Sequence, residues 1–230
     1  MAGNDDHIET RVLDAAQGLF LHYGFDKTTV NDIAREAGVA KSTIYTRWNK
    51  KEAIFDTLIW RESKRYTEDW MARVEADPQG GTYGAWMRHA LGAFFENEFL
   101  RVLYKQDRRM IGGLLQRQGM ENLFVRRKQM FETFFKQMQQ ANVVRQDIDA
   151  GTLSYLMNSL QYGLIHMIDI IPEDATPEMD DVLTMMVDML ERYVTLPEGA
   201  DREAGKQVLR QFMMQVRQLL DAFEHTHNQP

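Results

Sequence analysis

The sequence contains no cysteine and only five prolines among its 230 residues. Without cysteine, disulfide bridges and thiolate metal sites are excluded. Because proline is scarce, long stretches have no helix breaker, and no alternating strand pattern takes their place. With 44% hydrophobic residues, the chain is long enough for one sizeable core, or for a small domain joined to a larger one. These features favour an all-α protein.

Signals for export and for the membrane are also lacking. The opening residues, Met1 to Thr10, are acidic and polar, unlike a secretory signal. No apolar run approaches the roughly 18 residues that a membrane-spanning helix needs. We therefore expect a cytoplasmic protein with no membrane partner.

Motifs of common enzymes are missing as well. The sequence has no H-E-x-x-H, no G-x-S-x-G and no dinucleotide fingerprint. The stretch ending in Gly205-Lys206-Gln207 lacks the first glycine and the Ser or Thr of a phosphate loop, and no strand precedes it. The six histidines show no metal-ligand spacing except His225 and His227. We predict no enzymatic activity, no catalytic residue, no metal site and no cofactor.

The charge of the chain is unevenly distributed. The net charge of −7 argues at first against nucleic-acid binding. Residues 24–51, however, contain six basic and three acidic side chains, so this segment carries +3 and the remainder −10. Phosphate binding requires a locally positive face, and the charge of the whole chain matters less. The segment can therefore contact nucleic acid.

Three short helices are expected in the first fifty residues. An apolar stripe at steps of three and four predicts a helix over His7–Tyr23, which Gly24 ends in a left-handed conformation. Thr29 and Asp32 resemble a capping box, which predicts the start of a second helix. Gly38 ends that helix before a tight turn.

The third helix is expected over Ala40–Trp48. Ile44 and Trp48 lie on its predicted buried side, and Lys41, Ser42, Tyr45 and Thr46 lie on the opposite, exposed side. Two short helices joined by a Gly-containing turn form a helix-turn-helix, whose second helix enters the major groove of DNA.

The exposed side chains of the third helix suit DNA binding. Lys41 can reach a phosphate or a guanine edge, and Ser42 is small enough to let the helix approach closely. The hydroxyls of Thr43 and Tyr45 can bond to phosphates. Thr46 can contact a thymine methyl group.

The run GFDKTTVNDIAREAGVAKSTIY, from Gly24 to Tyr45, resembles the signature of the TetR family of transcriptional regulators. Trp48, Lys51-Glu52 and Ile54 continue the resemblance, which covers about a quarter of the chain. The resemblance implies a role in DNA binding for nine residues. Thr29, Tyr45 and Lys51 would hold phosphates, Asn31, Lys41, Ser42 and Thr46 would lie near base edges, and Thr43 and Arg47 would flank the backbone.

Two departures from the family pattern are apparent. Lys50 stands where the family often has the serine that caps the next helix, although Asn49 could take that role. Thr46 and Arg47 replace the usual aromatic pair. The second departure bears on base preference and leaves DNA binding itself unaffected.

The rest of the chain predicts a helical bundle. Helices are expected over residues 51–77, 82–106, 107–118, 121–141, 149–171, 177–194 and 204–223. The resulting fold class is all-α, with an N-terminal three-helix DNA-binding head followed by a larger helical-bundle domain for ligand binding and dimerisation. The boundaries that we predict are 5–66 for the head, about 29–48 for its helix-turn-helix, and 67–226 for the C-terminal domain. This layout resembles the TetR architecture in length and order.

Dimerisation is expected because a single recognition helix reads only a few base pairs. A two-fold homodimer can read both halves of a pseudo-palindromic operator in double-stranded DNA. Residues 149–171 and 177–194 are apolar on more than one face, so one face can pack on the core and another on a partner. Alternatively, these are simply central helices.

A small-molecule effector is also expected. The fifteen methionines and twelve phenylalanines supply adaptable apolar surface, which suits pockets that accept varied ligands. The candidate pocket residues are Trp86, Phe94, Met110, Leu114, Phe124, Phe134, Tyr162 and His166. Such residues at helical spacing also form ordinary cores, so both interpretations stay open. His166 could orient a polar group of the ligand.

These observations predict a sequence-specific DNA-binding transcriptional regulator, a repressor that a small apolar or aromatic ligand releases from its operator. The helix from Lys51 onward joins the head to the bundle and would transmit the ligand's effect. The alternative is an architectural DNA-binding or adaptor protein whose bundle binds protein partners. An activator is a third possibility.

Overall fold

The computed structural model describes residues 2–104, 120–196 and 198–227. Apart from one isolated bridge between Val144 and Thr195, the regular elements of these residues are helices, so the predicted all-α class is confirmed. The chain divides into two compact units. Unit 1 comprises Met1–Arg65, Asn97–Arg117 and Arg217–Pro230, and unit 2 comprises Tyr66–Glu96 and Gln118–Val216.

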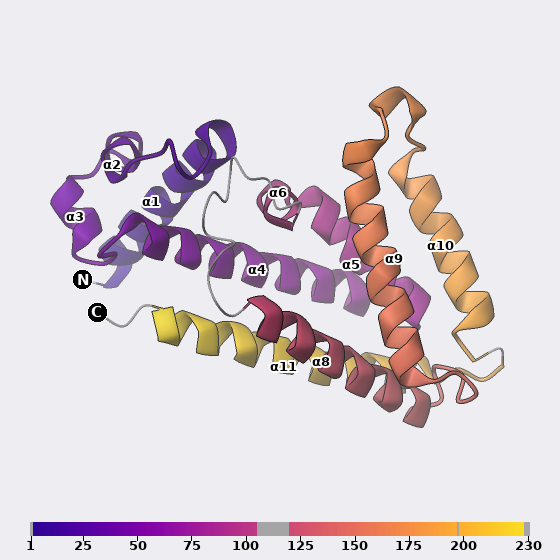
Figure 1. The fold of residues 1–230 in the computed structure, drawn as a ribbon. Coiled ribbons are helices and arrows are strands. Elements are labelled where there is room, and N and C mark those ends of the chain that lie inside the picture. The colour runs from indigo at the N-terminus through magenta and orange to yellow at the C-terminus, as the bar shows by residue number, and fades with distance from the viewer. Residues whose placement is uncertain (1, 105–119, 197, 228–230) are drawn as a thin grey trace. The chain divides into compact units, whose positions relative to one another are not determined.

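Unit 1 contains the N-terminal helices. They are α1 (Ala2–Tyr23), α2 (Val30–Ala37), α3 (Lys41–Tyr45), the first part of α4 (Lys51–Ala76) and α6 (Glu98–Tyr104). Figure 1 shows α1, α2 and α3 grouped beside the start of α4, and α2 contacts both α1 and α3. As predicted, Gly24 follows α1 with a φ of 83° and Gly38 follows α2 with a φ of 62°. This left-handed conformation is costly for other residues.

Four phenylalanines form the centre of unit 1. The ring of Phe20 lies 5.4 Å from that of Phe25 and 5.5 Å from that of Phe55, and Phe55 lies 5.9 Å from Phe99 of α6. All four side chains are buried. Tilted and edge-to-face aromatic pairs at this spacing add to the stabilisation that burial provides. The cluster thus joins α1, α4 and α6 into one core.

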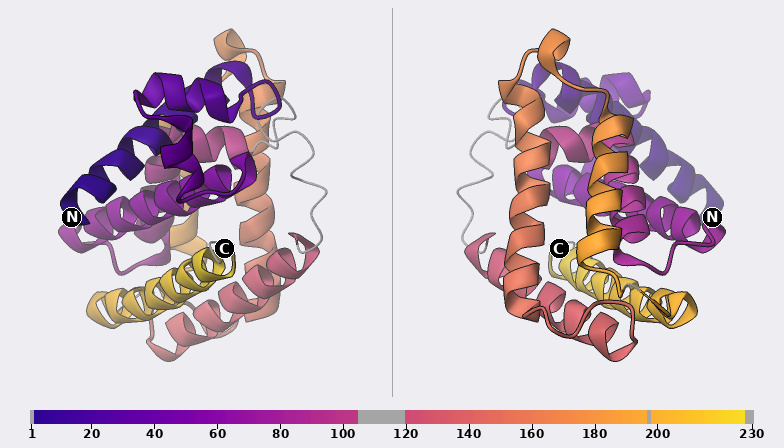
Figure 2. Two further views of the ribbon diagram at one scale, coloured as in Figure 1. Left: turned by 90° about the vertical axis from the view of Figure 1, so that its left-hand side faces the viewer. Right: turned by 90° about the vertical axis from the view of Figure 1, so that its right-hand side faces the viewer.

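Unit 2 is built from longer helices. They are the second part of α4, α5 (Tyr83–Glu96), α8 (Met120–Gln140), α9 (Ala150–Ile170), α10 (Met179–Tyr193) and the first part of α11 (Arg202–His227), with a short 3₁₀ turn at Glu173–Ala175. α10 packs on α5 and α8 packs on α9. Figure 2 shows α9 and α10 running alongside each other, joined by the loop that contains Pro172 and Pro177.

One predicted helix is divided into two in the structure. Residues 82–106 were expected to form one helix, but the helix is interrupted at Asn97, whose Oδ1 accepts a hydrogen bond of 2.9 Å from the amide of Leu100. Asn97 therefore begins a new helix, because its short side chain satisfies a backbone donor there. The helix predicted over 107–118 lies outside the described residues.

An aromatic cluster fills the core of unit 2. Trp86 stacks on Phe134 with ring centroids 5.1 Å apart, and Phe134 lies 4.8 Å from Phe212. The indole NH of Trp70 donates to the carbonyl of Trp86 at 3.2 Å. Such dense packing of large rings holds α4, α5, α8 and α11 together.

None of the described helices is both long enough and apolar enough to cross a membrane.

Candidate nucleic-acid interface and a cavity in unit 2

The turn and helix around α3 present a polar side to solvent. Lys41, Ser42, Tyr45 and Thr46 are exposed, as predicted, and Tyr45 is 45% exposed. Behind them Ile44 is fully buried and Trp48 is 3% exposed. The indole NH of Trp48 donates to the hydroxyl of Thr57 in α4 at 2.9 Å, which leaves no buried polar group unsatisfied there.

The helix itself is shorter than predicted. It ends at Tyr45 instead of Trp48, and Thr46 and Arg47 form a turn. The hydroxyl of Thr46 donates to the carbonyl of Thr43 at 2.7 Å. A threonine hydroxyl that bonds to the backbone in this way competes with helical bonding. Thr43, unlike Ser42 before it, is half-buried.

The start of α2 is held by the predicted capping box. The amide of Asp32 donates to the hydroxyl of Thr29 at 3.2 Å, and the amide of Thr29 donates to the carboxylate of Asp32 at 3.1 Å. The hydrogen bond from the Thr29 hydroxyl lowers the pKa of Asp32. Thr29 and Asn31 are exposed, but the hydroxyl of Thr29 is already engaged, so a phosphate contact there would be shared with the cap.

Lys51 has a structural role that the sequence did not reveal. Its ammonium donates to the carbonyls of Phe25 and Thr28 at 2.5 and 2.8 Å, and lies 4.1 Å from the centroid of the Phe25 ring. Burial lowers the pKa of Lys51. The ammonium thus fastens the loop between α1 and α2 to the start of α4. Its predicted contact with phosphate stays a prediction.

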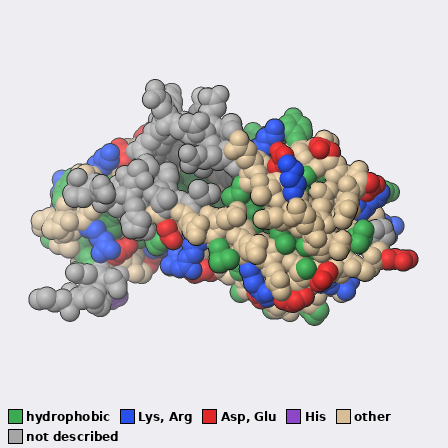
Figure 3. Space-filling model, turned by 90° about the horizontal axis from the view of Figure 1, so that it is seen from below, with side chains coloured by type: hydrophobic (Ala, Val, Ile, Leu, Met, Phe, Trp, Pro, Cys, Tyr) green, Lys and Arg blue, Asp and Glu red, His purple; other side chains and the backbone are tan. Residues whose placement is uncertain are grey.

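Among the basic side chains of the helix-turn-helix, residues 29–48, Lys41 is the most available. Arg47 forms an ion pair with Glu9 of α1, and Arg35 pairs with Asp32 at 2.9 Å. Lys41 has no ion-pair partner in the part of the chain that the structure describes, and its ammonium lies 5.6 Å from the Tyr45 ring centroid. On the face of the molecule that Figure 3 shows, Lys and Arg side chains are interspersed with Asp and Glu side chains.

Sequence reasoning missed one residue that positions the helix-turn-helix. Arg11 of α1 donates from Nη2 to the carbonyl of Ala37 and, at 3.0 Å, to that of Gly38. A cation at these carbonyls complements the negative end of α2. The only signal in the sequence was one basic residue on a predicted helix, which indicates no particular partner.

The predicted pocket residues whose side chains the structure describes differ in their surroundings. Trp86, Phe94 and Phe134 are buried, whereas Tyr162 is 52% exposed and stacks on His166 of the same helix at 3.8 Å. Met110 and Leu114 lie outside the described residues, and Phe124 lies in α8 with a side chain that is not described. The lining of an effector pocket by these residues stays a prediction.

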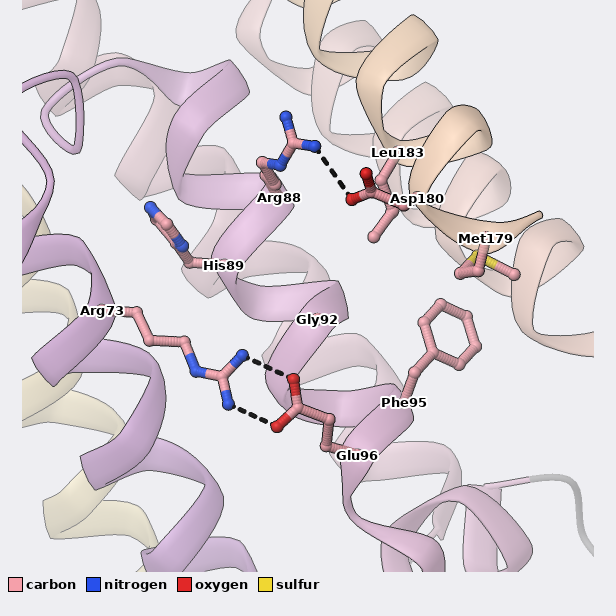
Figure 4. A pocket seen from close by; sticks show the side chains of 9 residues that line it. All are labelled: Arg73, Arg88, His89, Gly92, Phe95, Glu96, Met179, Asp180 and Leu183. Atoms are coloured by element: carbon pink, nitrogen blue, oxygen red, sulfur yellow. Dashed lines mark hydrogen bonds and ion pairs between the residues drawn. The ribbon is translucent and has the colours of Figure 1, made fainter.

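A cavity of about 300 Å³ lies instead between α4, α5 and α10 of unit 2 (Figure 4). The predicted pocket residues whose side chains the structure describes are not part of its lining. Its charged side chains are Arg73 from α4, Arg88, His89 and Glu96 from α5, and Asp180 from α10. Phe95, Met179 and Leu183 provide apolar surface, and Gly92 completes the lining.

Ion pairs organise this cavity. Arg73 binds the two oxygens of Glu96 at 2.8 and 2.6 Å and also Asp69 at 2.8 Å. Arg88 contacts Asp180 at 3.1 Å and the hydroxyl of Thr184 at 2.8 Å. Among the described residues, no group of three or more His, Asp or Glu is placed to hold a metal ion.

Comparison with known proteins identifies the N-terminal region. The family of bacterial regulatory proteins named tetR matches residues 12–58, which include α2, α3 and the start of α4. The HTH-type transcriptional repressor Rv1474c of Mycobacterium tuberculosis is 24% identical over 194 residues, which are 83% of this chain and 96% of that protein. In residues 12–58 the chain matches the TetR family.

Further comparisons agree with this assignment. The HTH-type transcriptional regulator UidR of Escherichia coli is 24% identical over 178 residues, covering 74% of this chain and 84% of UidR. The crystal structure of NalD, the secondary repressor of the MexAB-OprM multidrug efflux pump in Pseudomonas aeruginosa, has the same fold. It superposes with a TM-score of 0.58 at 21% identity, over 84% of this chain and 98% of NalD.

The comparisons also assign a general function to this protein. This protein is a DNA-binding transcriptional regulator, because its helix-turn-helix matches that of the TetR family and the relatives that span most of its length are transcriptional regulators. The architectural or adaptor alternative is not favoured, because the curated relatives that span most of the chain are transcriptional regulators.

Proposed function

We propose that this protein is a homodimeric repressor that binds a pseudo-palindromic operator through α3 and is released by a small molecule. DNA binding is assigned to residues 5–66, and dimerisation and effector binding to residues 67–226. The observation that carries the proposal is the exposed polar side of α3, held from behind by buried Ile44 and Trp48. Because operator DNA lies in the bacterial cytoplasm, we propose that location for the protein, with no catalytic activity.

Within the interface, Lys41 is assigned to base edges and Tyr45 to the phosphate backbone. Lys41 is exposed and has no ion-pair partner among the described residues, so it can donate to a guanine edge without breaking an existing bond. Tyr45 is exposed one helical turn later and can donate its hydroxyl to a phosphate.

Selection of bound sequences from a random DNA pool tests the DNA-binding part. A regulator is expected to enrich a short pseudo-palindrome with two half-sites. Lys41→Gln should relax base preference at particular positions, while Tyr45→Phe should weaken binding on all sequences alike. Lys136→Gln serves as the control, because it removes a charge at an exposed position of α8, outside the helix-turn-helix. Diffuse enrichment with no half-sites would contradict the proposal.

The dimer is proposed to form through the outer faces of α9 and α10. Each helix has a buried side, with Leu153, Met157 and Ile165 on α9 and Leu183, Met186 and Leu190 on α10. Each also exposes large apolar side chains, namely Tyr155, Leu156, Leu160, Tyr162, Met167, Ile170, Met185, Met189 and Tyr193. Exposed apolar groups gathered on neighbouring helices are typical of a protein interface, and a two-fold axis would bury them against themselves.

Light scattering after gel filtration tests the dimer. The protein should have twice the mass of the chain at micromolar concentration, and Leu156→Glu or Met189→Glu should shift it toward the monomer. Met214→Glu, at an equally exposed methionine of α11, should leave the dimer intact. A monomeric parent protein, or equal effects of all three substitutions, would contradict this interface.

Helix α4 is proposed to transmit the effect of the ligand. It is continuous from Lys51 to Ala76, and its residues belong to unit 1 up to Arg65 and to unit 2 from Tyr66. A ligand can release DNA only if it binds more tightly to a conformation with low operator affinity. An effector that binds the protein and leaves operator affinity unchanged would contradict this mechanism.

A further inference from the structure

We propose that the cavity between α4, α5 and α10 is the effector site, and that its ligand is a small organic carboxylate with an apolar or aromatic body. The ligand's regulatory role rests on the ligand-gated repression proposed above, whereas its binding does not. At about 300 Å³ the cavity lies at the lower end of the size range of small-molecule sites. Pockets of this kind combine apolar walls with a few polar groups that orient the ligand.

The apolar wall accommodates the body of the ligand. Phe95 of α5 lies opposite Met179 of α10 in Figure 4, and Leu183 continues the wall on α10. Gly92 contributes no side chain, and a Cβ added there would meet only Arg73, at 3.6 Å. Aromatic and methionine side chains adapt to flat or branched apolar groups.

The charged groups favour an anion over a cation. The two arginine side chains are 30% and 35% exposed, whereas their partners at the cavity, Glu96 and Asp180, are 66% and 86% exposed. The positive groups therefore lie deeper than the negative ones. A ligand that enters the cavity with a carboxylate places its charge nearer to the cations than the protein's own exposed carboxylates do.

Arg88 is the expected partner of the ligand. Arg73 is already held by two carboxylates, Glu96 and Asp69, through bonds of 2.6 to 2.8 Å. Arg88 makes one ion-pair contact, of 3.1 Å, with a nearly fully exposed aspartate, and its other contact is with the neutral hydroxyl of Thr184 at 2.8 Å. Since exposed ion pairs contribute little, a better-placed carboxylate can replace Asp180 and bind the guanidinium with two hydrogen bonds.

The position of the cavity suits regulation. Its lining comes from α4, which continues into unit 1, and from α10, which exposes Met185 and Met189 on the proposed dimer face. A ligand that replaces Asp180 at Arg88 alters the contact that joins α5 to the first turn of α10. One binding event thus acts on both the helix that leads to the DNA-binding head and a helix of the proposed interface.

Isothermal titration calorimetry on the full chain tests the site. The probes are phenylacetate and hexanoate, their neutral amides, and phenethylamine. We expect the two carboxylates to bind at least tenfold more tightly than the amides and the amine, because only they bring a negative charge to the guanidinium of Arg88 and can accept from it in the bidentate geometry. No binding of either carboxylate, or equal binding of carboxylate and amide, would overturn the proposal.

Two substitutions that remove opposite charges should change the affinity for phenylacetate in opposite directions, which strengthens the test. Arg88→Gln should weaken phenylacetate binding at least tenfold, and Asp180→Asn should tighten it, because the competing carboxylate is removed. Arg192→Gln, at an exposed arginine of α10 paired with Asp188, should have no effect. A thermal melt confirms that each variant is folded. Weaker binding in both Arg88→Gln and Asp180→Asn would indicate a merely structural ion pair and would overturn the assignment.

Operator binding separates this proposal from the proposed function. If phenylacetate binds but operator affinity is unchanged, the site stands and ligand-gated repression fails. If the protein binds a pseudo-palindromic operator but neither carboxylate binds, the regulator stands and the cavity is not its effector site.

Discussion

Gly38 satisfies two conditions at the turn between α2 and α3. Its φ of 62° is in the left-handed region, and a Cβ at this position would lie 2.8 Å from Nη2 of Arg11. The same guanidinium group donates to the carbonyls of Ala37 and Gly38. The side chain that caps α2 therefore occupies the space that any other residue would need.

Gly38→Ala should destabilise the protein. The left-handed conformation costs alanine about 1–2 kcal/mol, and displacement of Arg11 adds to this. Gly18→Ala is the matched control, since Gly18 lies inside α1 and a Cβ there meets nothing within 4 Å. This control should stabilise the protein by up to about 1 kcal/mol. Urea denaturation measures both changes, and equal stability of the two variants would contradict the account.

Glu9→Gln should raise the affinity for operator DNA. Glu9 pairs with Arg47 at the end of the helix-turn-helix, so its carboxylate competes with phosphate for that guanidinium. Once freed, Arg47 should add about one phosphate contact and steepen the salt dependence of log K by about 0.9. Fluorescence anisotropy at several salt concentrations measures this.

The control for Glu9 is Asp14→Asn. Asp14 also lies on α1 and pairs with an arginine, Arg61 of α4, at 2.6 Å, but that arginine is outside the helix-turn-helix. DNA affinity and its salt dependence should be unchanged in this variant. Unchanged or weakened DNA binding by Glu9→Gln would show that the ion pair positions Arg47 instead of masking it.

Among the elements, α2 depends most clearly on its cap. Its eight residues are too few to be stable alone, so the hydrogen bonds between Thr29 and Asp32 and the packing of Ile33 are needed. α3 is shorter still and depends on Ile44 and Trp48. Both helices of the DNA-binding motif therefore owe their stability to what surrounds them.

Thr29→Ala should lower the free energy of unfolding by about 0.5–2 kcal/mol, because the amide of Asp32 loses its acceptor. Thr29→Ser retains the hydroxyl and should lose much less. Urea denaturation without DNA isolates this effect from any contact of Thr29 with phosphate. A similar loss in the serine variant would mean that the threonine methyl group, not the cap, provides the stability.

At the scale of the whole molecule, carboxylates paired in the native state determine the response to acid. Hydrogen bonds from Arg210 and from Arg73 hold the pKa values of Glu75 and Glu96 below the ordinary 4.5. A hydrogen bond from the amide of Thr152 holds the pKa of Asp149 below the ordinary 3.8. The unfolded chain thus binds more protons than the native one as these groups titrate.

The contribution of these ionised carboxylates to the free energy of unfolding should be fully present above about pH 5. It should fall as the pH drops through about 4.5 and below, because protonation favours the unfolded chain. Urea midpoints between pH 7 and pH 3 measure this. Glu96→Gln should make the urea midpoint fall less steeply with decreasing pH, since one titrating group is removed. A midpoint that is constant down to pH 3 would contradict the pKa shifts.

Local features of the sequence were sufficient to predict that the helices of the DNA-binding motif exist, although α3 ends at Tyr45 and not at Trp48 as predicted. The ends of α1 and α2 follow from Gly24 and Gly38, and the start of α2 follows from Thr29 and Asp32, which lie within one turn of each other. The burial of Ile44 and Trp48 follows from their spacing of four residues, which places both on one side of a predicted helix. These features depend on neighbours three or four residues apart, which a sequence displays directly.

Only the tertiary structure decided which side chains these elements bring together. Arg11 meets carbonyls 26 and 27 residues away, Lys51 meets Phe25 and Thr28, and Arg47 meets Glu9. The cavity likewise combines Arg73, Arg88 and Asp180 from three helices. A charged side chain can pair with any opposite group that folding brings near it, and periodicity says nothing about which one that is. The sequence by itself therefore determined that this is a helical protein with a DNA-binding head, and packing determined which of its charges remain available to a ligand.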